Sequence, residues 1–223
     1  MRDRLMVALD VPRADEGLAM RDKLGDSVGW LKIGLRLFVA SGPALVHALG
    51  ERHKVFLDLK FHDIPNTVAE AVASAGGLGV QMLNVHAGGG LEMMQAASRA
   101  AEAFPDMRLI AVTVLTSDKM DVRAAAKLAI ERALLARQSG LHGVVCSVHE
   151  AAAIKQACGA DFLTVTPGIR LAGGDQDDQV RVATPGLAIS QGADHLVVGR
   201  PILRAADPRA VALDILRLMQ QGA

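Results

Sequence analysis

The sequence predicts an α/β fold, a single (β/α)₈ barrel formed by residues 1–223, on the basis of three observations. Short β-branched or apolar runs recur eight times, beginning about every 27 residues, so each gap has room for one helix. Several of these runs are almost continuously apolar, a pattern typical of parallel strands that are buried on both faces. The chain has 223 residues, 51% of them hydrophobic, which is enough for one large core and hardly for two domains.

The predicted strands and helices alternate along the whole chain. Helices are indicated by stretches rich in Ala, Leu and charged residues at 91–104 and 123–138, and by a Ser147-x-x-Glu150 capping-box pattern before a run of alanines. An open, doubly wound sheet is the alternative fold, because counting strands does not establish closure. In both folds we expect the functional groups at the C-terminal ends of the strands. The predicted strands span residues 5–11, 30–34, 55–61, 82–86, 109–115, 143–148, 162–166 and 195–199.

Composition argues against several classes of protein. Lys and Arg together number 24, as do Asp and Glu, so the formal net charge is zero, and aromatic residues make up only 3%. A nucleic-acid binder normally has a basic excess or aromatic stacking platforms, so we expect no nucleic-acid partner. The longest uncharged stretch, residues 71–91, is rich in glycine and would span a bilayer badly. Two cysteines, Cys146 and Cys158, suit a reducing compartment, so we expect a soluble, cytoplasmic protein.

Charged residues stand at the ends of the first three predicted strands. Asp10 follows the first, Lys32 lies in the second, and Asp58 and Lys60 lie two residues apart in the third. Side chains two apart on a strand share a face, so Asp58 and Lys60 are expected to face the mouth of the barrel together, with Asp10 and Lys32 as partners. A structural ion-pair network is the alternative interpretation. Four charges at one edge of three neighbouring strands favour a functional array.

The last two predicted strands indicate an anion site. One ends in a segment that reaches Arg170, and the other runs into Gly199 and Arg200. The loops after strands seven and eight commonly bind phosphate in such barrels, and an Arg fork suits phosphate oxygens. The intervening residues 171–179 are polar with paired glycines, as in a lid that closes over a ligand.

Residues 58–67 read DLKFHDIPNT, and this block resembles the orotidine 5′-phosphate decarboxylase family. Further motifs of the family occur in the same order: ALD at 8–10, LKIG at 31–34, NVHA at 84–87, VTVLTS at 112–117, TPGIR at 166–170 and VGRPI at 198–202. The resemblance covers nearly the whole chain. It implies a (β/α)₈ barrel, a homodimer with shared active sites at the subunit interface, a nucleotide substrate, and neither a metal ion nor an organic cofactor.

The resemblance also implies a role for individual residues. The catalytic array would be Lys32, Asp58, Lys60 and Asp63, with Lys60 as the proton donor. Asp63, Ile64 and Thr67 would reach the active site of the other subunit. The remaining substrate contacts would be Asp10 and Lys32 at the ribose, Thr116 at the pyrimidine, and Arg170, Gln179, Gly199 and Arg200 around the phosphate, with Gln179 on the lid.

The implied reaction is decarboxylation of orotidine 5′-phosphate to UMP, and its chemistry explains the need for such residues. Loss of CO₂ leaves an electron pair on C6 that the ring π system does not delocalise, so the protein must supply fixed charge there. Two alternatives remain open. A metal-dependent sugar-phosphate decarboxylase or lyase of the same superfamily would share the Asp-x-Lys-x-x-Asp core, although residues 64–67 favour the nucleotide enzyme. A non-catalytic sensor of phosphorylated ligands would keep the barrel without the reaction.

Overall fold

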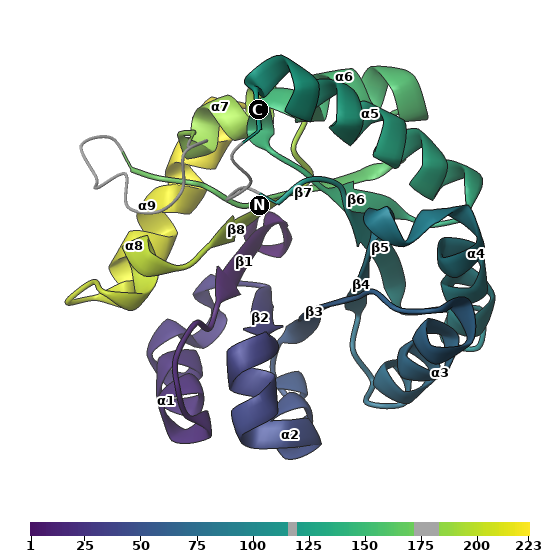
Figure 1. Cartoon of the computed structure of the whole chain (residues 1–223). Coiled ribbons are helices and arrows are strands. Elements are labelled where there is room, and N and C mark those ends of the chain that lie inside the picture. The colour runs from purple at the N-terminus through teal and green to yellow at the C-terminus, as the bar shows by residue number, and fades with distance from the viewer. Residues whose placement is uncertain (116–119, 172–182) are drawn as a thin grey trace.

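The computed structural model describes residues 1–115, 120–171 and 183–223, and within these ranges the strands form a closed parallel barrel (Figure 1). Each strand pairs with its neighbour in the sequence, and β8 pairs with β1 to complete the ring. Closure excludes the open, doubly wound sheet. The strands are β1 (Leu5–Ala8), β2 (Trp30–Gly34), β3 (Lys54–Phe61), β4 (Met82–His86), β5 (Arg108–Val112), β6 (Gly143–Val145), β7 (Leu163–Thr166) and β8 (His195–Val198).

Helices surround the barrel and connect its strands (Figure 1). The predicted capping box is present, because the backbone N–H of Ser147 donates to the Glu150 side chain and the Ser147 hydroxyl accepts from the helix. Pro43, next to Gly42 with φ of 64°, marks a kink inside α2. The helices are α1 (Ala14–Leu24), α2 (Leu35–Gly50), α3 (Pro65–Gly76), α4 (Gly90–Ala101), α5 (Val122–Gln138), α6 (Val148–Cys158), α7 (Pro185–Ser190), α8 (Arg200–Leu203) and α9 (Pro208–Gln221), with short 3₁₀ turns η1 (Arg2–Arg4), η2 (Gly25–Ser27) and η3 (Ala87–Gly89).

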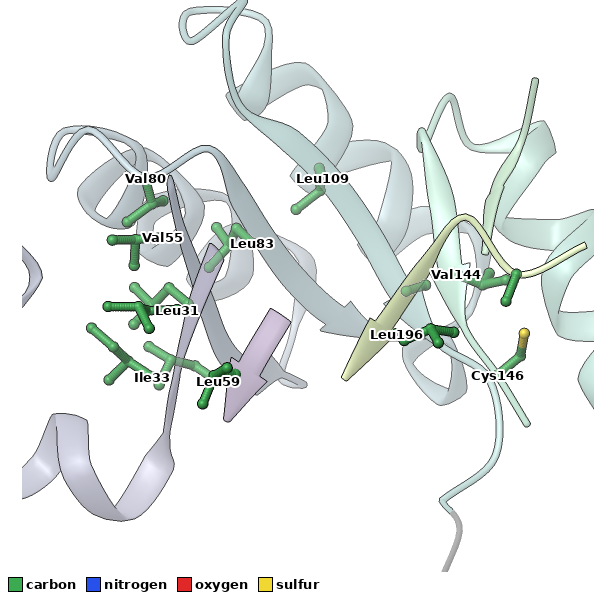
Figure 2. Packing of buried hydrophobic residues seen from close by; sticks show 14 of the residues in the cluster. Leu31, Ile33, Val55, Leu59, Val80, Leu83, Leu109, Val144, Cys146 and Leu196 are labelled. Carbon is green, nitrogen blue, oxygen red and sulfur yellow. The ribbon is translucent and has the colours of Figure 1, made fainter. Parts of the chain in front are cut away.

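The core has two layers, as expected for strands buried on both faces. Side chains such as Met6, Phe56 and Ile110 fill the inside of the barrel. Alternate residues, among them Leu31 and Leu83, point outward and pack against the helices, and Figure 2 shows part of this outer layer. The described residues contain no helix that combines the length and the apolar character needed to cross a membrane.

Three strands end three residues earlier than the sequence predicts. β1, β5 and β6 end at residues 8, 112 and 145, whereas the apolar runs continue to residues 11, 115 and 148. The extra apolar side chains are used differently, because Val11, Leu115 and Cys146 line a cavity at the mouth of the barrel. An apolar run therefore predicts burial correctly here, while the end of the ladder is set by the loop that turns toward the cavity.

Candidate active site

The C-terminal ends of the strands surround a cavity of about 650 Å³. Apolar side chains form part of its lining and include Phe56, Val112 and Val197. Charged side chains from both ends of the sequence meet around this apolar surface, which is the composition expected of a small-molecule site. They are Asp10, Glu16, Lys32, Asp58, Lys60, Arg170, Arg200 and Arg204.

The four charges that the sequence singles out form one continuous array. Asp58 stands at its centre: its Oδ1 accepts from Lys60 Nζ at 2.6 Å and its Oδ2 from Lys32 Nζ at 3.0 Å. Lys32 Nζ also lies 3.6 Å from Asp10 Oδ1. Carboxylates and ammonium groups therefore alternate from Asp10 to Lys60, as predicted.

Burial and pairing act in opposite directions on the array. Burial by itself raises the pKa of Asp58, but the charges of Lys32 and Lys60 and the hydrogen bonds to its oxygens outweigh burial and lower the pKa to about 2. Burial likewise opposes the charge of Lys32, yet Asp58 and Asp10 keep its pKa above the usual value. Asp58 and Lys32 are thus fixed as an ionised pair inside the protein.

The backbone of β3 departs from the regular pleat at Lys60. Leu57 is opposite Leu83 of β4, but Phe61 is opposite Val85, so β3 carries two extra residues in between. Lys60 has φ of 53°, the only positive value at a non-glycine position in the described chain. The left-handed conformation costs about 1–2 kcal/mol for such a residue. Asp58 and Lys60 therefore meet across a bulge rather than along one face of a flat strand, which corrects the simple two-residue rule.

Asn84 of β4 is a site residue to which the sequence analysis gave no role. Its side chain is fully buried, its Oδ1 accepts from the backbone N–H of Lys60 at 2.8 Å, and its Nδ2 donates to Asp58 Oδ1 at 2.7 Å. The signal in the sequence is an amide in the middle of the apolar run 82–86, where a polar side chain requires a buried partner.

Asp63, Ile64 and Thr67 do not join the array within one subunit. All three are exposed, and none lines the cavity. Asp63 Oδ1 accepts from the backbone N–H of Ile64 at 2.7 Å, an interaction local to the start of α3. Their assignment to a shared site stays a prediction.

The predicted anion-binding residues also line the cavity. Gly199 stands before α8, Arg200 is the first residue of that helix, and both line the cavity together with Arg170. A side chain at Gly199 would meet Asp10 Oδ2 at 3.4 Å, so the two ends of the chain pack closely here. Thr116 and Gln179, and with Gln179 nearly all of the predicted lid, lie outside the described residues.

Two contacts brace the loops around the cavity. Arg132 of α5 donates from Nη1 to the carbonyl oxygen of Thr113 at 2.5 Å and so ties down the loop that follows β5. His62 stacks on His86 with 5.2 Å between ring centroids and 4° between planes.

Among the described residues, His, Cys, Asp and Glu side chains do not gather in a group of three able to hold a metal ion.

A closed (β/α)₈ barrel with charged groups from several strands around its C-terminal mouth belongs to the class of barrels that carry an active site there. The family model described as "Orotidine 5'-phosphate decarboxylase / HUMPS family" matches residues 3–215. This match covers nearly the whole chain. The chain therefore belongs to this family.

Similar proteins agree with this membership. A protein of Chromohalobacter salexigens named orotidine 5′-phosphate decarboxylase is 52% identical over 222 residues, which cover 96% of this chain and 94% of the relative. One of the same name from Moorella thermoacetica is 50% identical over 235 residues, 96% of this chain and 92% of the relative. The crystal structure of orotidine 5′-phosphate decarboxylase from Lactobacillus acidophilus superimposes with a TM-score of 0.86 at 36% identity, covering 98% of this chain and 99% of that one.

Proposed function

We propose that this protein decarboxylates orotidine 5′-phosphate to UMP and CO₂ with protein side chains alone. One observation carries the proposal: Lys60 Nζ donates at 2.6 Å to Asp58, whose carboxylate is held ionised, and both residues line the cavity at the mouth of the barrel. Relatives about half identical over nearly the whole chain are named for this activity.

The array suits the chemistry of the reaction. When the bond between C6 and the carboxylate breaks, CO₂ leaves and the electron pair stays on C6. A positioned ammonium stabilises this charge as it develops, and it needs no reorganisation because Asp58 already holds it. Lys60 Nζ then donates a proton to C6, which gives UMP, and the resulting amine regains a proton from solvent. The Asp58 carboxylate accepts hydrogen bonds from two ammonium groups and from one side-chain amide.

The rest of the cavity divides between the ribose and the phosphate. Asp10 and Lys32, at the start of the array, bind the ribose hydroxyls, and Arg170, Gly199 and Arg200 bind the phosphate. The family resemblance assigns Thr116 to the pyrimidine and Gln179 to the phosphate, and both lie outside the described residues. Binding energy collected at the phosphate, away from C6, is available to hold the reacting carbon against Lys60.

We also propose a homodimer in which each subunit completes the site of the other. The surface formed by the starts of α2 and α3, which follow neighbouring strands, exposes apolar side chains: Leu35 is 54% exposed, Val39 81% and Ile64 65%. A second copy covering this surface would bury these side chains and bring Asp63 and Thr67 to the partner's cavity. Asp63 would then be the second carboxylate beside Lys60.

The remaining expectations follow from the substrate. The partner is a soluble nucleotide rather than a nucleic acid or a membrane, and the cytoplasm is the expected location. The described cysteines, Cys146 and Cys158, are not joined in a disulfide, as is usual in a reducing compartment.

The ultraviolet change that accompanies conversion of orotidine 5′-phosphate to UMP, followed with and without EDTA, tests the proposal. We expect equal turnover in both conditions. Turnover that disappears with EDTA and returns with a divalent metal would favour a metal-dependent decarboxylase or lyase of the same superfamily. Tight binding of UMP without any turnover would favour a phosphate-ligand sensor.

A further inference from the structure

The catalytic lysine has a backbone conformation that its own side chain does not explain. Lys60 lies in the left-handed region within a bulge of β3, next to a strand with two fewer residues. Because the bulge disrupts the ladder, the N–H of Lys60 needs an acceptor other than a β4 carbonyl. It finds one in the side chain of Asn84, at 2.8 Å.

The orientation of the Asn84 amide follows from its two neighbours. A backbone N–H is only a donor, so the atom that faces Lys60 is the carbonyl oxygen Oδ1. The amino group Nδ2 then faces Asp58 Oδ1 at 2.7 Å, and an ionised carboxylate is only an acceptor. Both contacts are satisfied only with the amide in this orientation, and the side chain is fully buried.

Asn84 therefore joins the two ends of the bulge. It holds the backbone of Lys60 on one side and the side chain of Asp58 on the other, and these two residues also bond to each other through Lys60 Nζ. An amide does this without adding a charge. A carboxylate of the same shape would offer no donor to Asp58 and would repel it.

We propose that Asn84 is the positioning residue of the reaction, which fixes Lys60 in its left-handed conformation and aims the ammonium at Asp58 and the cavity. Asn84 lines neither the ribose nor the phosphate side of the cavity, so its contribution concerns the chemical step and not substrate affinity. The inference rests on the proposed decarboxylation.

The first test replaces Asn84 by Ala and measures kcat, KM and the dissociation constant of UMP. We expect kcat to fall about 100-fold or more, with KM and UMP affinity changed less than about 5-fold. Thr164→Val is the matched control, because Thr164 is also fully buried on a strand but bonds Asp194 and the Gly192 carbonyl oxygen instead of the array. Its kcat is expected to stay within about 2-fold of wild type.

The second test uses Asn84→Asp, which keeps the shape of the side chain and is measured from pH 8 to pH 5.5. An ionised carboxylate at this position lacks the donor, but a protonated carboxyl group has one O–H donor and one carbonyl acceptor, like the amide. The ratio of variant to wild-type kcat is therefore expected to rise about 10-fold as the pH falls. A merely structural role would not produce this dependence.

Two results would overturn the proposal: kcat of Asn84→Ala within about 3-fold of wild type, or a ratio for Asn84→Asp that does not change with pH. If Asn84→Ala does not fold, the pH dependence of Asn84→Asp decides alone. Failure of the proposed function is recognised separately, as absence of turnover in the wild-type protein. In that case a crystal structure of Asn84→Asp still tests the geometry, and an unchanged Lys60 backbone with an unchanged contact to Asp58 at neutral pH would refute it.

Discussion

The two ends of the barrel treat polar groups in opposite ways. At the C-terminal mouth, ionised Asp58 and Lys32 are buried as a pair beside a strained Lys60. At the N-terminal end, the side chains His53, His142 and His195 stand at or just before the starts of β3, β6 and β8, and burial lowers the pKa of all three. At one end ion pairing outweighs burial, and at the other end burial lowers the pKa of three imidazoles.

At the N-terminal end, side chains of η1 and β2 close the barrel through hydrogen bonds to backbone carbonyl groups and a ring contact. Trp30 Nε1 donates to the Asp3 carbonyl oxygen at 3.0 Å, and its ring meets His195 edge-on, with 5.6 Å between centroids. Arg4 donates to the carbonyl oxygens of Ala193 and Asp194, just before β8. These contacts tie η1 to the starts of several strands. We therefore assign stability mainly to this end, and backbone strain and buried ion pairs to the end where we propose that the reaction takes place.

The largest expected effect is a difference in kcat between variants of the two lysines at opposite ends of β3. Lys60→Ala is expected to lower kcat by about 10⁴-fold or more, because both the charge at C6 and the proton are lost, while UMP affinity stays nearly unchanged. Lys54→Ala, at the N-terminal end of the same strand, removes only a contact to Asp3 and the ring of Trp30 and is expected to leave kcat unchanged. Substantial turnover by Lys60→Ala would remove the distinction between the two ends.

The shared site is tested by mixing inactive subunits. Asp63→Ala and Lys60→Ala proteins are each expected to be nearly inactive, but their heterodimers contain one intact site. Random exchange of equal amounts should therefore restore about a quarter of wild-type activity. Mass spectrometry checks the exchange. If heterodimers form and no activity returns, Asp63 does not complete the partner's site.

The phosphate side of the mouth should show a smaller effect. Arg200→Ala is expected to weaken UMP binding about 100-fold and uridine binding much less, since a charged hydrogen bond to phosphate is lost. Isothermal titration with both ligands measures the difference. Arg209→Ala, which breaks a surface pair with Asp26, serves as the control. Equal losses for UMP and uridine would place Arg200 away from the phosphate.

The smallest effect concerns stability in acid at the N-terminal end. Burial lowers the pKa of His195 to about 4, whereas the unfolded chain has an ordinary imidazole near 6.5. As the pH falls, the unfolded state therefore binds a proton before the folded state does. The contribution of His195 to the free energy of unfolding is complete above pH 6.5 and is lost as the pH falls toward 4. His195 alone is expected to lower the free energy of unfolding by about 2 kcal/mol between pH 7.5 and pH 5.

Urea unfolding at several pH values measures that loss. His195→Gln is expected to reduce this pH-dependent decrease in the free energy of unfolding. His47→Gln, at an exposed position on α2, should leave the decrease unchanged. An acid dependence that is the same in His195→Gln and wild type would show that His195 is not responsible. Activity at neutral pH is expected to be unchanged in both variants.

The contrast between the ends also explains what the sequence predicted. The barrel followed from spacing and apolar runs, and the array followed from charges such as Lys32 and Asp58 at predicted strand ends, where lone charges are costly. β2 and β4 begin and end where expected. These features depend on short-range patterns that can be recognised directly in the sequence.

The rest depends on contacts between distant segments. The left-handed Lys60 arises from the register of β3 against β4, and the role of Asn84 from two hydrogen bonds that only this register permits. The N-terminal end of the barrel is likewise closed by a contact between distant segments, because Trp30 and Asp3 of η1 are 27 residues apart in the sequence. Local propensity contains no information on such pairings.

The central claim is that Lys60 stabilises negative charge at C6 and delivers a proton there, and exchange of the C6 hydrogen of UMP in D₂O tests it most directly. Because every step of protonation can run backward, wild-type protein saturated with UMP should introduce deuterium at C6 faster than buffer does, and Lys60→Ala should not. NMR follows the loss of the C6 proton signal. Equal exchange by wild type and Lys60→Ala, or none in the wild type, would contradict the role that the geometry gives to Lys60.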